Sequence, residues 1–241
     1  MTDPLSSNSQ PMQAFAQWRF VQLTLVILLY ILLAPWLASL SILKLIAQIV
    51  LFNTLFVTVS TAPARKFDRR LKSAAWVLFA LSFTASIVEM TSLFESWQDA
   101  IWYADLASSI LVQIGCAAGI LYYIARSRHV TIDNIFAAIV TYILIALVFA
   151  MVYLLIWQVN PSAFSLPPEL SANSEDARVT MIYFSFVTMA TLGYGDITAT
   201  DPFARMVTII EAMTGQFYVA ILVGVLVGLY ISHSTSRVQR D

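Results

Sequence analysis

The feature that most constrains this chain is an almost unbroken apolar run of 42 residues from Trp18 to Val59. As a single helix this run would be about 63 Å long, twice the roughly 30 Å thickness of a bilayer's hydrocarbon core. It must therefore fold back on itself, and Pro35 in LLAPWLAS marks the place. We predict one membrane-spanning helix over 18–36 and a second over 39–60.

The composition is that of a membrane protein. Of the 241 residues 59% are hydrophobic and only 11% are charged, and the mean hydropathy is +0.79. Soluble domains carry about 25% charged residues, so a water-soluble enzyme with one packed core is nearly excluded. Cys116 is the only cysteine and the two histidines stand apart in the sequence. The chain therefore offers no intrachain disulfide, and a structural metal site is not expected.

Further apolar segments follow, separated by charged or proline-containing stretches. We predict additional spanning helices over 73–94, 106–125, 134–157 and 202–231. Asp133 and Asp201 stand where the last two would take their N-cap residues. The connection 95–105 is acidic and aromatic, which is typical of a membrane surface.

Basic residues set the predicted orientation. Ten of the 13 Lys and Arg fall in the loop 65–72, in the turn 126–128, in the last ten residues and at Arg19. The positive-inside rule places these segments and both termini in the cytoplasm, which requires an even number of spans. Six spans fit. The apolar segment 179–190 is too short to cross and must re-enter from outside, between helices 5 and 6.

Re-entrant backbone at membrane depth is tolerated only where it is buried in protein or lines a water-filled path. Here the segment YFSFVTMA leads into Thr191, Leu192, Gly193, Tyr194, Gly195 and Asp196. With its short helix and flanking spans, about residues 134–231, this stretch resembles the pore of potassium channels, whose filter signature is TVGYGD. The resemblance implies an all-α membrane protein with six transmembrane helices, a re-entrant pore helix and a selectivity-filter loop.

The physics of ion passage explains these residue types. A K⁺ ion must exchange its water shell for protein oxygens, which the carbonyls of Thr191, Leu192, Gly193 and Tyr194 would supply. Carbonyls that all face one axis require left-handed angles at alternate residues, which Gly193 and Gly195 adopt without steric cost. The Thr191 hydroxyl would add an inner oxygen ring, and Asp196 would attract cations at the outer mouth. Leu192 and Tyr194 would brace the loop against the short helix.

Two positions depart from the family pattern. Leu192 replaces the usual Val, a conservative change for a side chain that faces away from the ion. Tyr183 and Phe184 stand where the pore helix often carries tryptophans, so we expect one hydrogen bond that braces the filter to be absent.

One chain supplies one filter strand, whereas four are needed to encircle an ion, so the resemblance implies a homotetramer with the pore on its four-fold axis. We expect passive K⁺ conduction across the plasma or inner membrane, with no cofactor, no nucleic-acid partner and no enzymatic activity. The spans hold no Ser/His, paired-Asp or HExxH arrangement of an intramembrane protease. The alternative is a non-conducting or regulatory membrane subunit with a channel-like pore fold, against which the intact TLGYGD argues. The predicted organisation is a cytoplasmic tail 1–16, a four-helix membrane domain 17–130, a pore domain 131–232 and a short tail 233–241.

The last helix contains three glycines and one acid of interest. Gly215 lies 19 residues after Asp196, where potassium channels keep a hinge glycine; it could instead only permit close packing. Gly224 and Gly228 form GxxxG, a packing pattern. Glu211 lies within the membrane and is a functional candidate by default; the other interpretation is a pore-supporting carboxyl, hydrogen-bonded behind the filter to the pore helix or a neighbouring subunit.

The four-helix domain has the layout of a voltage sensor without its charges, because no Lys or Arg occurs between Ser73 and Ala125. Each elementary charge moved across the membrane contributes about 2.3 kcal/mol per 100 mV, so steep gating needs several. We therefore predict that open probability changes only weakly over about ±100 mV in planar bilayers. Neutralising Arg126 and Arg128 together should leave this response unchanged. A sigmoidal conductance curve with an effective valence of several charges would contradict the prediction.

Overall fold

The computed structural model describes residues 19–37, 46, 49–50, 52–54, 56–57, 69–91, 97–126, 131–167 and 174–238. This part of the chain is mainly helical. Its long helices are α2 (Arg19–Leu37), α4 (Arg69–Thr91), α5 (Gln98–Arg126), α6 (Ile132–Val159), α7 (Ser174–Met189) and α8 (Pro202–Val238). A short 3-10 turn, Pro161–Ala163, leads into strand β1 (Phe164–Ser165), which pairs antiparallel with β2 (Thr198–Ala199) in the register Phe164 to Ala199.

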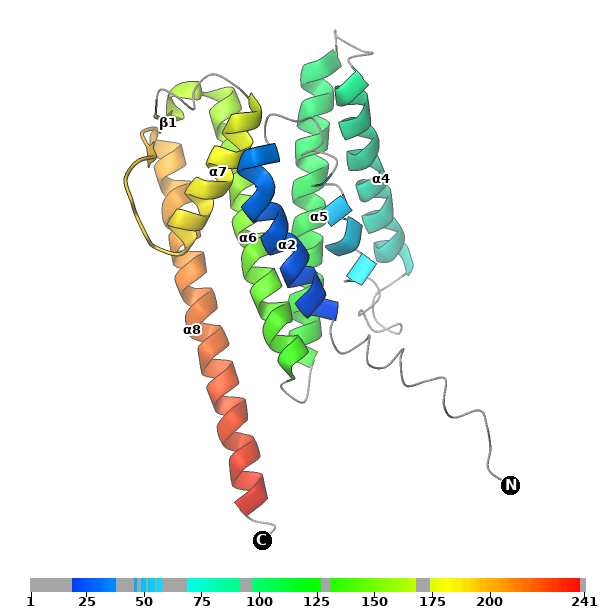
Figure 1. Cartoon of the computed structure of the whole chain (residues 1–241), viewed down its shortest axis with the longest axis vertical. Coiled ribbons are helices and arrows are strands. Elements are labelled where there is room, and N and C mark those ends of the chain that lie inside the picture. Colours follow the sequence, from blue (N-terminus) through cyan, green and yellow to red (C-terminus); the bar gives the residue numbers. More distant parts are fainter. Residues whose placement is uncertain are drawn as a thin grey trace, which may run out of the picture.

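Helix α6 is the centre of the arrangement, because it packs against α2, α5, α7 and α8. Figure 1 shows α4 and α5 on one side of it and α7 and α8 on the other, with α2 in front. The beginning of α2 and the end of α8 lie at the same end of the bundle, in agreement with an even number of crossings (Figure 1). The side of the membrane that this end faces remains a prediction.

Within the described residues, three helices are long and apolar enough to cross a bilayer: Arg19–Trp36, Gln98–Arg126 and Ile132–Val159. Shorter apolar helical segments cover Trp76–Val88 and Ala177–Met189. The described part is therefore an all-helical membrane protein, apart from the two-residue strands. The predicted helix 39–60, the tail 1–16 and much of the loop 65–72 lie mostly or wholly outside the described residues, so the count of six spans remains a prediction.

The prediction that residues 95–105 form a connection between helices is wrong from Gln98 onward. Helix α5 begins at Gln98, and Asp105 is buried within it. One carboxylate oxygen of Asp105 accepts hydrogen bonds from the hydroxyls of Ser82 (2.8 Å) and Ser86 (3.0 Å) on α4. These donors come from another helix and compensate the cost of burying the acid. Helix α5 can therefore include an acidic residue that the sequence alone places at the surface.

The predicted caps have different outcomes. Asp201 caps α8 as predicted, since its Oδ1 accepts from the backbone N–H groups of Phe203 (2.8 Å) and Ala204 (3.2 Å). Asp133 does not cap its own helix; Thr131 does, through Asn134 N at 3.3 Å. Asp133 instead accepts from the backbone N–H of Phe20 at 3.1 Å. That N–H lies in the first turn of α2 and lacks a partner within its own helix, so Asp133 ties α2 to α6.

Candidate functional site

The site is built on the way in which the short helix α7 ends. The backbone N–H of Thr191 bonds to Thr188 O at 2.9 Å, and that of Leu192 bonds to Val187 O, also at 2.9 Å. This pair of bonds is a Schellman motif, in which the residue after the helix takes a left-handed conformation. Glycine usually occupies that position, whereas here it is Thr191, with φ = +56°. The motif satisfies two orphan carbonyls at the helix end and turns the chain sharply into the segment that follows.

The segment after the turn has an alternating backbone. Positive φ occurs at Thr191 (+56°), Gly193 (+59°) and Gly195 (+79°), and at no other described residue. The sequence predicts two of these angles, at the glycines. Thr191 was missed because its angle comes from the helix-ending motif rather than from a residue type that favours it.

Two apolar side chains of this segment are largely uncovered in the single chain. Leu192 is 55% exposed and Tyr194 is 66% exposed. The expectation that these two side chains brace the loop against the short helix remains a prediction. Any contact that covers them must come from outside the single chain.

A brace does exist, at a position where it was expected to be missing. The Tyr183 hydroxyl on α7 donates to Oδ2 of Asp196 at 2.7 Å. The tyrosine thus supplies a hydrogen bond between the short helix and the far end of the segment 191–196, and the predicted loss of such a bond is corrected. Phe184, the next residue, has a different role: its ring packs edge-on against Tyr153 and Phe164, with centroids 5.0 and 5.5 Å away.

Helix α8 lies directly against the end of α7. A β-carbon added at the buried Gly215 would overlap the main-chain oxygen of Met189 and lie 2.9 Å from its Cγ. One residue later, Gln216 Nε2 is 3.4 Å from the Thr191 hydroxyl. The close-packing interpretation of Gly215 therefore describes what the structure shows. The helix continues through this position, and a hinge role remains a prediction.

Glu211 lies one turn before Gly215 on the same face of α8 and is fully buried. Its Oε1 is 2.5 Å from the hydroxyl of Ser185 on α7, and its Oε2 is 2.5 Å from the hydroxyl of Tyr153 on α6. The carboxyl group thus joins α6, α7 and α8. The intramembrane acid was visible in the sequence, but Ser185 and Tyr153 were not, because each is an ordinary residue within an apolar run.

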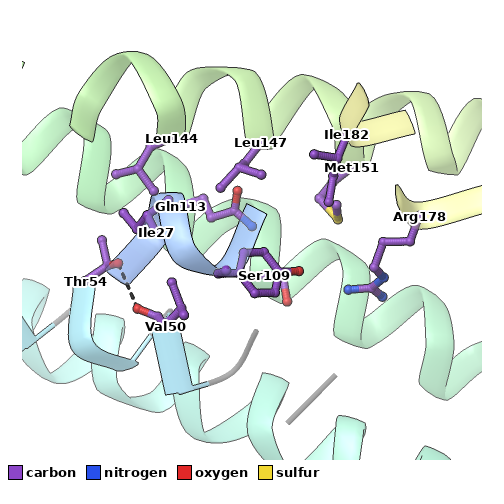
Figure 2. Close-up of a pocket in the computed structure, with 11 residues that line it drawn as sticks. Ile27, Val50, Thr54, Ser109, Gln113, Leu144, Leu147, Met151, Arg178 and Ile182 are labelled. Carbon is purple, nitrogen blue, oxygen red and sulfur yellow. Dashed lines mark hydrogen bonds between the residues drawn. The ribbon is translucent and has the colours of Figure 1, made fainter. Parts of the chain in front are cut away.

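A cavity of about 50 Å³ lies between α2, α5, α6 and α7, with Val50 and Thr54 also in its lining. Figure 2 shows Arg178 near one end of it, with Gln113 and Leu144 further along. Gln113 is buried, and its Oε1 has no hydrogen-bond partner among the described residues. The cavity is about a third of the size of one that accommodates benzene, so it suits a few water molecules rather than a lipid chain.

Taken together, the site presents a short helix that ends within the molecule, an exposed polar backbone strand and an exposed acid at the strand's outer end. Within the described residues no group of three or more His, Cys, Asp or Glu could hold a metal ion. A strand with alternating backbone angles can offer successive carbonyl oxygens to a cation, provided that other strands complete the shell.

We predict that Gly215→Ala destabilises the protein, because the added methyl group displaces the carbonyl end of α7. The thermal midpoint in detergent should fall by several degrees, as expected for about 1–3 kcal/mol of overpacking. Gly115→Ala is the matched control, since Gly115 is also in a helix and has nothing within 4 Å of the added carbon. Equal midpoints for the two variants would contradict close packing at Gly215.

Comparisons with known proteins agree with this geometry. A family model described as "Ion channel" matches residues 138–232, which run from α6 through the filter segment into α8. Protein LctB of Bacillus caldotenax is 28% identical over 124 residues, covering 50% of this chain and 91% of LctB. No solved structure matches the chain. The chain is thus a helical multi-pass membrane protein. Its residues 138–232 match the ion channel family and are called the channel domain below.

Proposed function

We propose that the protein conducts K⁺ passively as a homotetramer, with Thr191, Leu192, Gly193 and Tyr194 of four chains forming the selectivity filter. The observation that carries the proposal is the alternation of positive φ at Thr191, Gly193 and Gly195 within TLGYGD. It occurs directly after a short helix inside an ion-channel domain.

The alternation matters because of what a dehydrated cation needs. In an ordinary strand successive carbonyls point to opposite sides, whereas left-handed angles at every second residue allow them to share one side. Four such strands would replace the water shell of K⁺ with stacked rings of oxygens. The partial negative charge at the C-terminus of α7 would favour a cation at the inner end of the filter, and the exposed Asp196 would favour one at the outer end.

Support for a tetramer comes from apolar surface that the single chain leaves uncovered beside the filter. Leu192 and Tyr194 are exposed, and so is a set of large apolar side chains on α8: Phe203, Met206, Ile209, Ile210, Met213, Phe217, Val219, Ile221 and Val225. They lie around more than one side of the helix, so one face can contact lipid while another contacts neighbouring chains. A tyrosine hydroxyl in lipid lacks hydrogen-bond partners, which favours protein contact for Tyr194.

The second candidate, a non-conducting or regulatory subunit with a channel-like fold, fits the same family. A regulatory subunit does not need three consecutive alternations of backbone angle, one of them at a strained threonine. Positive φ in a non-glycine residue costs about 1–2 kcal/mol. A turn that only ended α7 would need the angle at Thr191 but not the two further ones at Gly193 and Gly195, so we favour conduction.

We predict that Gly193→Ala abolishes the preference for K⁺ over Na⁺. Nothing lies within 4 Å of a β-carbon added at Gly193 in the single chain, so the effect comes from its φ of +59°. An alanine there costs about 1–2 kcal/mol in each of four strands, and the strands are expected to relax away from the alternating geometry. Flux from liposomes loaded with K⁺ or Na⁺ measures the ratio. Unchanged discrimination, with Gly115→Ala as the control for a neutral glycine change, would rule out this filter assignment.

We also predict four copies of the 26.8 kDa chain in native mass measurements of the detergent-solubilised protein. A single chain presents only one filter strand, and a ring of oxygens requires several. A stable monomer that still conducts K⁺ would contradict the proposal.

A further inference from the structure

The hydrogen-bond network around Glu211 bears on the protonation state of its carboxyl group. Three short oxygen–oxygen contacts meet there: Tyr153 hydroxyl to Glu211 Oε2 at 2.5 Å, Ser185 hydroxyl to Glu211 Oε1 at 2.5 Å, and Ser185 hydroxyl to the main-chain oxygen of Ala146 at 2.6 Å. Glu211, Tyr153 and Ser185 are all fully buried. Each contact is short enough to require a hydrogen between its two oxygens.

Counting hydrogens determines the protonation state. Tyr153 and Ser185 carry one hydroxyl hydrogen each, and the Ala146 carbonyl is only an acceptor. With Glu211 ionised, two hydrogens would have to serve three contacts. The hydrogen of Ser185 could go to Ala146 or to Glu211, and the other contact would be a repulsive approach of two acceptors at 2.5–2.6 Å.

A neutral Glu211 supplies the third hydrogen. Its acid O–H donates to the Ser185 oxygen, Ser185 donates to Ala146 O, and Tyr153 donates to the other Glu211 oxygen. Every buried polar atom of the network is then paired, as buried networks require.

Among the residues that the structure describes, no cation pairs with Glu211 to favour its ionised form. Glu211 makes no ion pair with any described residue. On α7 the described cation Arg178 lies seven residues before Ser185, about two turns away. On α8, Arg205 lies six residues before Glu211 and donates its Nε–H to the main-chain oxygen of Ala199 at 3.1 Å. A buried carboxylate without a partner is costly and takes up a proton instead.

We propose that Glu211 is a neutral carboxylic acid that acts as a positioning residue: as a hydrogen-bond donor to Ser185, it fixes the inner helix α8 to the pore helix α7 and to α6. The Ser185 to Ala146 bond extends the same chain to a second point on α6. Ser185 lies two residues before Val187, whose carbonyl closes the turn into the filter segment. The network therefore sets where that turn is held. The link to conduction rests on the proposed function; the protonation state does not.

Infrared difference spectroscopy on the full-length protein in lipid tests the protonation state directly. Wild type should show the carbonyl stretching band of a protonated carboxylic acid at neutral pH, and Glu211→Gln should lose it. Asp99→Asn is the matched control, because Asp99 is exposed in the first turn of α5 and its removal should leave the band in place. A wild-type spectrum that differs from Glu211→Gln only in carboxylate bands would overturn the proposal.

Potassium flux in liposomes tests the positioning role. The glutamine side chain can donate its N–H to Ser185 and accept from Tyr153, so Glu211→Gln should keep flux within about threefold of wild type. Glu211→Ala removes the partner that Glu211 gives to each of the two hydroxyls and should reduce flux at least about tenfold. Equal loss in the two variants would show that a negative charge is needed and would overturn the proposal. Absence of flux in wild type would count against the proposed function alone, because the infrared result still decides the state of Glu211.

Discussion

A membrane interior offers no water to the backbone, and this constraint shapes the channel domain more than any other. Helices satisfy their own N–H and C=O groups, but residues 190–197 leave the helical ladder between α7 and α8. The structure deals with this in two ways. The first N–H groups after α7 bond back to Val187 and Thr188. The following residues, Leu192 to Asp196, keep an exposed strand, which is compatible with a membrane only if the strand faces protein or a water-filled path.

Holding such a strand in place requires rigid support from the helices around it. Tyr183 and Asp196 fix its outer end, and the contact of Gly215 with Met189 fixes its inner end. Glu211 joins α8 to both α7 and α6 just behind it. Most of these supports come from residues on α7 and α8 that contribute nothing to the strand itself. The strand's geometry is thus a property of the packed helices as well as of its glycines.

The sequence predicts the helices well because long apolar runs have few alternatives in a bilayer. It also predicts the short helix, the cap at Asp201 and the left-handed angles at Gly193 and Gly195, since each depends on a local pattern. The errors involve partners far away in the chain. Asp105 can be buried because the hydroxyls of Ser82 and Ser86 on α4 donate to it. Asp133, at the start of α6, accepts a hydrogen bond from the backbone of α2 instead of capping its own helix. Ser185 and Tyr153 carry no local signal at all, because their roles exist only once α6, α7 and α8 are packed.

The helices outside the channel domain have a polar interior of their own. Ser82 joins Asp105 and Ser109, so α4 and α5 are linked by hydroxyl and carboxyl groups rather than by arginines. Between these helices and the channel domain lies the small cavity beside Gln113 and Arg178 (Figure 2). Such an interface can tie the two parts together without moving charge across the membrane. That these helices support a pore and do not sense voltage remains a prediction.

The central claim is that four copies of the strand from Thr191 to Tyr194 surround dehydrated K⁺. Its most direct test is a crystal structure of the assembled protein, with crystals grown in a thallium salt. Thallium substitutes for K⁺ and is located by anomalous scattering. The account predicts a row of thallium peaks on a four-fold axis at the level of Thr191 to Tyr194. An assembly in which these strands do not meet on an axis, or in which thallium lies elsewhere, would contradict it.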